Sequence, residues 1–96
     1  MRTVNTKVSP EEIAAARSAM RAIAVDHVPG SLRAGVRIEK VGAESGDAHA
    51  NGALGRIVGV MPVAVEGEFA YFVAWDDMPE APVFTRGKRV REVVDG

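Results

Sequence analysis

The apolar residues in the first third of the chain recur at three- and four-residue spacing, which places them on one face of a helix. They are Ile13, Ala16, Met20 and Ile23. Ser9 and Pro10 precede this run, and Glu12 stands where it completes a capping box with the serine. Val28-Pro29-Gly30 ends the run, because proline cannot extend a helix. The pattern predicts a helix over residues 10–26 with one thin apolar face.

After the helix, apolar and charged positions alternate, which is the two-residue period of a half-buried strand. Val36 and Ile38 are the apolar members of the first such run. Residues 43–53 predict a loop, because Gly46-Asp47 and Asn51-Gly52 are turn formers. A second strand is predicted over residues 55–65, in which Gly59 and Pro62 mark a bulge or bend.

The clearest strand covers residues 69–75 and is apolar on both faces, which is typical of a strand inside a sheet. Glu66-Gly67-Glu68 precedes it and predicts a tight hairpin connection, because its glycine accepts the unusual turn conformation. Two shorter strands follow at residues 82–85 and 88–94, separated by a turn at Arg86-Gly87.

Five short strands joined by tight turns have few ways to hide both faces and both edges other than curling into a small closed barrel. We therefore predict a mainly β protein, a five-stranded SH3-like barrel preceded by one N-terminal α-helix. Residues 1–30 form an arm and the amphipathic helix, residues 31–96 form the barrel, and together they make one compact domain. We expect the helix to cover the side that carries Ala70, Phe72 and Ala74, or one open end.

Composition limits the chemistry that is open to this chain. It contains no cysteine, which excludes disulfides, thiolate nucleophiles and cysteine-based metal sites. Hydrophobic residues at 47% and charged residues at 26% are typical of a folded globular domain. Residues 1–9 lack the apolar run of a signal peptide, and no stretch reaches the roughly 18 apolar residues of a membrane span. These features predict a cytoplasmic protein without membrane contact.

Two segments, Gly55-Arg56-Ile57-Val58-Gly59-Val60 and Tyr71-Phe72-Val73-Ala74-Trp75-Asp76-Asp77, form a recognisable pattern. They resemble small SH3-like, KOW-like bacterial barrels, nearest to an uncharacterised actinobacterial SH3-like domain family with Gly-x-Ile-Val and Tyr-x-Val-x-Trp-Asp-Asp strands. The likeness covers about residues 35–92. It implies a barrel fold in a bacterial protein and carries over no activity. Met78-Pro79 departs from the pattern, since such domains usually follow Trp-Asp-Asp with glycine.

Residues of catalytic type form no recognisable motif. His27 is assigned to the end of the helix and His49 to a solvated loop, with only Asp47 near His49 as a co-ligand. No histidine pair has the spacing of a zinc site, and no serine stands in a nucleophile elbow. No helix start follows the glycines to make a phosphate-binding loop. We therefore expect a non-enzymatic protein without metal or cofactor.

Residues 66–85 hold five acids and no basic residue, and aromatic side chains lie among these acids. An aromatic ring with an acidic rim suits a basic partner segment, through cation–π contact and charge pairing. We predict a protein-binding corner, with core packing as the alternative for the aromatic rings and the favoured one for Tyr71. Its predicted residues are Tyr71, Trp75, Asp76, Asp77, Glu80 and Phe84.

Three alternatives stay open. The last strand carries a basic cluster that suits weak nucleic-acid binding, or that pairs with nearby acids at a sheet edge. This cluster is Arg86, Lys88, Arg89 and Arg91. The acidic segment over residues 66–85 also resembles the charge of SH3-like antirepressors that act as nucleic-acid mimics. The apolar face of the helix can pair with a second copy to make a homodimer. The predicted function is a binding or regulatory module.

Overall fold

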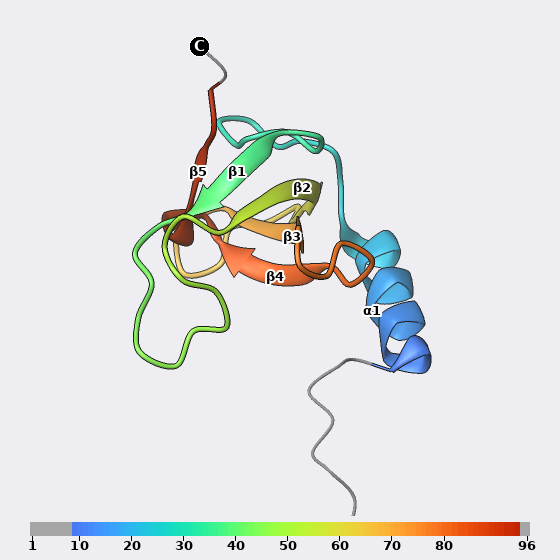
Figure 1. Ribbon diagram of the computed structural model, residues 1–96. Coiled ribbons are helices and arrows are strands. Elements are labelled where there is room, and N and C mark those ends of the chain that lie inside the picture. The colour runs from blue at the N-terminus through green and yellow to red at the C-terminus, as the bar shows by residue number, and fades with distance from the viewer. Residues whose placement is uncertain (1–8, 95–96) are drawn as a thin grey trace, which may run out of the picture.

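Five antiparallel strands and one helix form the part of the chain that the computed structural model describes, residues 9–94 (Figure 1). A mainly β protein with one N-terminal α-helix is therefore confirmed. The elements in chain order are α1 (Pro10–Ile23), β1 (Arg37–Lys40), β2 (Leu54–Val60), β3 (Ala70–Trp75), β4 (Val83–Arg86), the 3-10 turn η1 (Gly87–Arg89) and β5 (Val90–Glu92).

The strands form one sheet in the order β4-β3-β2-β1-β5. β3 pairs with β2 on one side and with β4 on the other, as its two apolar faces predict. The register between β2 and β3 shifts between Ile57 and Gly59, which confirms the irregularity predicted at Gly59. β2 ends at Val60 rather than at residue 65. β4 and β5 occupy the two borders of the sheet.

The sheet does not close, so the prediction of a closed barrel is wrong. β4 pairs only with β3, and β5 pairs only with β1, within the described part of the chain. β4 and β5 differ in direction because η1 turns the chain between them. β5 is also only three residues long. The predicted fifth strand at residues 88–94 therefore divides into η1 and a short β5. An opening remains beside β4, where a closed barrel would have a further row of hydrogen bonds.

The hydrophobic core lies on one side of this sheet. Ile38, Ile57, Val60 and Val73 are fully buried, and Tyr71 and Trp75 pack with them. The segment between α1 and β1 closes over this core through Val28, Leu32 and Val36. The hydroxyl of Tyr71 accepts a hydrogen bond from the backbone N–H of Leu32 at 3.1 Å, which fixes the segment to β3. The core cover is thus an irregular segment with turns at residues 29–30 and 34–35, which the sequence pattern did not predict.

The start of α1 agrees with the sequence and its end does not. The Ser9 hydroxyl accepts from the Glu12 N–H at 3.2 Å, and the Glu12 carboxylate accepts from the Ser9 N–H at 3.0 Å. The helix stops at Ile23 instead of residue 26 because Val25 pairs with Val60 of β2. The backbone N–H of each residue donates to the carbonyl of the other, at 2.8 Å in both cases. His27 consequently lies outside the helix.

α1 touches the sheet through its last turn. A Cβ atom at Gly59 would lie 2.8 Å from the Cβ of Ala24 and 3.5 Å from the sulfur of Met20. Gly59 is paired with Phe72, so this contact reaches the predicted side of the sheet. No residue of α1 is buried, however, and the helix extends beyond the sheet instead of covering it (Figure 1). None of the helices in the described residues is long and apolar enough to cross a membrane.

The hairpin before β3 confirms the predicted tight turn. Its backbone differs from the expectation in that two residues, and not the glycine alone, adopt the unusual turn conformation. Val65 and Glu68 form an isolated β-bridge around Glu66 and Gly67. Both central residues have positive φ, 51° for Glu66 and 82° for Gly67. This combination matches the twist of the flanking strands but strains a non-glycine residue. Glutamate, and not a second glycine, occupies the first of these positions.

Candidate binding site beside the β4 edge

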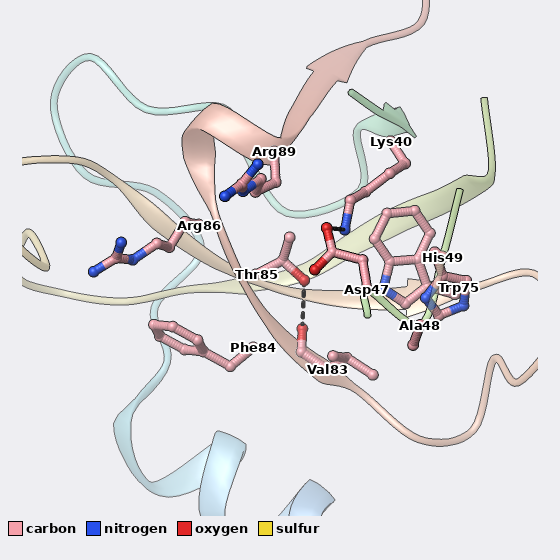
Figure 2. A pocket seen from close by; sticks show the side chains of 10 residues that line it. All are labelled: Lys40, Asp47, Ala48, His49, Trp75, Val83, Phe84, Thr85, Arg86 and Arg89. Carbon is pink, nitrogen blue, oxygen red and sulfur yellow. Dashed lines mark hydrogen bonds and ion pairs between the residues drawn. The ribbon is translucent and has the colours of Figure 1, made fainter. Parts of the chain in front are cut away.

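A hollow of about 290 Å³ opens beside β4, where the sheet fails to close (Figure 2). One wall is β4, and the other comes from the β1–β2 loop, residues 43–53. We call it the β4 hollow and define it by its lining: Lys40, Asp47, Ala48, His49, Trp75, Val83, Phe84, Thr85, Arg86 and Arg89. All four residues of β4 contribute.

The β4 hollow continues the core side of the sheet. Val83 pairs with Val73 and Thr85 pairs with Tyr71, and side chains of paired residues lie on the same face. Lys40 follows Ile38 by two residues on β1, so it also takes a core-side position. The last positions on this side are therefore a lysine and a threonine, where an apolar core would have aliphatic side chains.

Lys40 is the most unusual of these side chains, because it is a charged group with only 8% of its surface exposed. Its ammonium nitrogen lies 3.4 Å from Oδ2 of Asp47. The same oxygen accepts a hydrogen bond from the N–H of Glu44 at 2.9 Å. That backbone hydrogen bond, followed by Lys40 and Arg89, holds the pKa of Asp47 below its ordinary value. At the inner end of the hollow, the ammonium of Lys40 thus has one carboxylate partner, that of Asp47.

His49 fixes the loop wall to the sheet. Its imidazole stacks on the indole of Trp75, with ring centroids 4.6 Å apart and an angle of 21° between the planes. Its Nε2 lies 3.0 Å from Oδ1 of Asp77, so the ring is held from two directions. Trp75, which lies beneath the imidazole, has only 2% of its surface exposed. The β1–β2 loop is thereby attached to the C-terminal end of β3.

The predicted acidic and aromatic corner does not form as expected. Tyr71 and Trp75 are buried, with 3% and 2% exposure. Both rings lie on the core side of β3, and core packing is the alternative that the structure confirms. Phe84 is 46% exposed, contacts Phe72 edge to face at 6.2 Å, and lines the β4 hollow.

The acids of the same corner have partners of their own. Both carboxylate oxygens of Asp76 accept from Arg37, each at 2.6 Å, and this pairing holds the pKa of Asp76 below its ordinary value. Asp77 holds His49. Glu80 is exposed and lines a different, smaller cavity between α1 and the β3–β4 loop. The structure does not bring the six predicted residues together into one surface.

Each residue of the predicted basic cluster forms an ion pair with an acid from another part of the chain. The pairs are Arg86 with Glu66 and Glu68, Lys88 with Glu68, Arg89 with Glu44, and Arg91 with Glu39. Arg89 also donates to the carbonyl of Gly42. Two members, Arg86 and Arg89, line the β4 hollow. Glu66 and Glu68 of the acidic segment thus pair with Arg86 and Lys88, whereas Arg89 and Arg91 pair with acids from β1 and the loop after it.

The outer border of β4 has free backbone groups. The N–H of Gly87 donates to the carbonyl of Phe69 at 2.7 Å. Hydrogen-bonded pairs alternate along an antiparallel ladder, so the next two bonded pairs are Thr85 with Tyr71 and Val83 with Val73. The N–H and C=O of Phe84 therefore point away from β3, toward the border of the sheet. This border lies directly beside the β4 hollow.

Comparison of the chain with protein-family models, curated proteins and solved structures gave no match. The geometry of the chain's own residues therefore carries the functional argument.

Sequence reasoning missed three residues that define this site. Lys40 had a visible signal, because it takes the core-side position after Val36 and Ile38 in the two-residue period. Asp47 and Thr85 gave none. Their roles depend on a loop and a strand that lie 38 residues apart in the sequence and meet only in the fold.

Proposed function

We propose that this chain is a non-enzymatic binding module that receives a segment of a partner protein in the β4 hollow. One observation carries the proposal: a border strand lines, along its whole length, a hollow that ends at a buried lysine. An open strand border and a hollow with a few well-placed polar groups are both features of protein recognition sites.

Exposed apolar residues support a protein partner. Val83 and Phe84 keep 43% and 46% of their surface exposed, although both belong to a strand. Exposed apolar side chains next to a few polar groups are typical of a surface that another protein covers.

Nucleic acid fits this surface less well. Binding to phosphates depends on basic side chains that release counterions along the backbone, and each added acid opposes it. All four residues of the basic cluster are matched by acids, and the whole chain has a formal charge of −1. The same matching weakens the idea of an acidic nucleic-acid mimic. The likeness to SH3-like bacterial barrels, and with it a cytoplasmic setting, stays a prediction.

The polarity of the proposed partner differs from the one predicted from sequence. A basic partner would need the carboxylates of Asp76 and Asp77, which Arg37 and His49 already occupy. The buried base of the β4 hollow is Lys40, which faces a single carboxylate, that of Asp47 at 3.4 Å. The geometry favours a partner segment that brings a negative charge.

A peptide-display selection tests the proposal. Random peptides are enriched on the wild-type protein and then tested on two variants of the β1–β2 loop. Ala48→Trp fills the β4 hollow from its exposed wall, whereas Ala50→Trp adds the same ring to an exposed position outside the lining. We expect the enriched peptides to bind wild type and Ala50→Trp and to lose binding to Ala48→Trp. Equal binding to both variants would show that the hollow is not the site.

A further inference from the structure

We propose that the partner segment binds as an additional antiparallel strand on β4 and places a carboxylate in the β4 hollow. This proposal rests on the proposed function and specifies the chemistry of the partner, an extended peptide in which acidic and apolar residues alternate.

The backbone of β4 supplies the first argument. The N–H and C=O of Phe84 point away from β3, and no backbone bond to Phe84 from outside the sheet occurs in the described part of the chain. An incoming antiparallel strand can satisfy both groups with one residue, in the geometry that every other pair in this sheet uses. Figure 1 shows β4 at the free border of the sheet.

The alternation of side chains supplies the second argument. A peptide residue opposite Phe84 lies on the outer face of the sheet, where it meets the exposed ring of Phe84 and the half-buried ring of Phe72. The peptide residues on either side lie opposite Val83 and Thr85, on the core side, and point over the hollow. The site thus selects an apolar residue at one position and a residue that enters the hollow at each neighbouring position.

Charge decides which residue enters. Lys40 has one carboxylate partner at 3.4 Å, and a lysine ammonium has three donors. Arg89 already pairs with Glu44, and Arg86 already pairs with Glu66 and Glu68. Lys40 is therefore the basic group of the hollow with donors left for a further carboxylate. A carboxylate of the peptide can therefore contact Lys40 at the end of the hollow that Asp47 and Arg89 also line, whereas the Arg86 side chain extends away from Lys40 (Figure 2).

A second copy of this chain does not match the site. Its own β4, Val83-Phe84-Thr85-Arg86, contains no acid, so a copy paired about Phe84 would place Val83 and Thr85, and no carboxylate, over the hollow that holds Lys40. The border is thus open to a foreign acidic strand and disfavours self-pairing.

The test uses short peptides, capped at both ends and free of tryptophan, with binding measured by calorimetric titration. The first peptide alternates valine and aspartate. The second has asparagine in place of aspartate, and the third has the first composition with its aspartates clustered. We expect binding of the first to be stronger than that of the other two by about tenfold or more, because one charge pair or the strand pattern is lost. An asparagine peptide with a free C-terminal carboxylate shows whether a chain terminus can serve as the acid.

Backbone pairing is tested separately with Phe84→Pro, which removes the outward N–H without touching a bond to β3. Phe84→Ala is the matched control, because it removes the same ring and keeps the N–H. Since the proline variant can lose stability, wild type is also tested with peptides methylated on nitrogen. Methylation of the valine amides should abolish binding, whereas methylation of the aspartate amides should leave it within about threefold, because only the former face Phe84 in an antiparallel strand.

Several results would overturn the proposal. If aspartate and asparagine peptides bind equally well, the site does not recognise a carboxylate. If methylation of the valine amides leaves binding unchanged, the peptide does not bind as an added strand. A dimer at micromolar concentration that Phe84→Pro abolishes would assign the border to a second copy. Binding of a single-stranded oligonucleotide that Arg86→Gln and Arg89→Gln abolish would favour nucleic acid. If selected peptides lack alternating acids but still need an open hollow, this proposal fails while the proposed function holds.

Discussion

The imidazole of His49 stacks on the indole of Trp75, with 4.6 Å between the ring centroids, and thereby joins the β1–β2 loop to the end of β3. Trp75 is the chain's only tryptophan, so all tryptophan fluorescence of the protein comes from the ring that His49 covers. The loop wall of the β4 hollow depends on the same contact.

Removal of the stacking ring should expose the indole. We expect His49→Ala to shift the Trp75 emission to longer wavelength and to lower the free energy of unfolding by about 0.5–1.5 kcal/mol, the usual range for an aromatic pair. Emission spectra and urea titrations measure both effects. Asp77→Asn is the control, because it weakens the ion pair with His49 and keeps the ring. An unchanged emission maximum in His49→Ala would show that the ring does not cover Trp75.

The hydroxyl of Tyr71 should contribute to stability through the segment that covers the core. Tyr71→Phe leaves the N–H of Leu32 without its acceptor at 3.1 Å while the ring stays in place. We expect a loss of about 1 kcal/mol in the free energy of unfolding, typical for one hydrogen bond to a half-buried group. Denaturant titration measures it. A stability equal to that of wild type would mean that water replaces the phenol at no cost.

Close approach of α1 to β2 requires a glycine at position 59. Gly59→Ala places a methyl group 2.8 Å from the Cβ of Ala24, so the last turn of the helix must shift. We expect a loss of about 1–3 kcal/mol, the usual cost of overpacking. The double variant Gly59→Ala with Ala24→Gly should recover part of this loss, because it removes the atom that clashes. Purely additive effects in the double variant would contradict the contact.

The ion pair between Arg37 and Asp76 should make stability depend on pH. The pairing with Arg37 lowers the pKa of Asp76 in the folded protein below its ordinary value of 3.8. Its contribution is therefore present above pH 3.8 and is lost as pH falls through the folded pKa. We expect Asp76→Asn to be less stable than wild type at pH 7, and the difference to vanish at strongly acidic pH. A constant difference across this range would exclude the ionised pair as the cause.

Much of the fold could be predicted because its signals are local. The Ser9 capping box depends on residues three apart, and the two apolar faces of residues 69–75 place β3 inside the sheet from their order alone. The end of α1 could not be predicted in this way. It depends on hydrogen bonds between Val25 and Val60, two residues that no local pattern connects.

The candidate site could be predicted only in part, for the same reason. Arg86 and Phe84 were identified by type, but the sequence could not show that Glu66 neutralises Arg86 or that His49 covers Trp75. The run of five acids over residues 66–85 indicated a charged surface, whereas the fold divides four of them among separate ion pairs. Charge along the chain is a poor guide to charge on the surface when hairpins bring opposite segments together.

Amide hydrogen exchange along β4 tests the central claim most directly, namely that this strand is an open border with Phe84 facing outward. In the free protein, the N–H of Thr85 should exchange slowly because it bonds to Tyr71, and that of Phe84 should exchange at nearly the unprotected rate. Addition of the alternating valine–aspartate peptide should slow Phe84 and leave Thr85 as it was. Equal protection of both amides in the free protein would contradict the account.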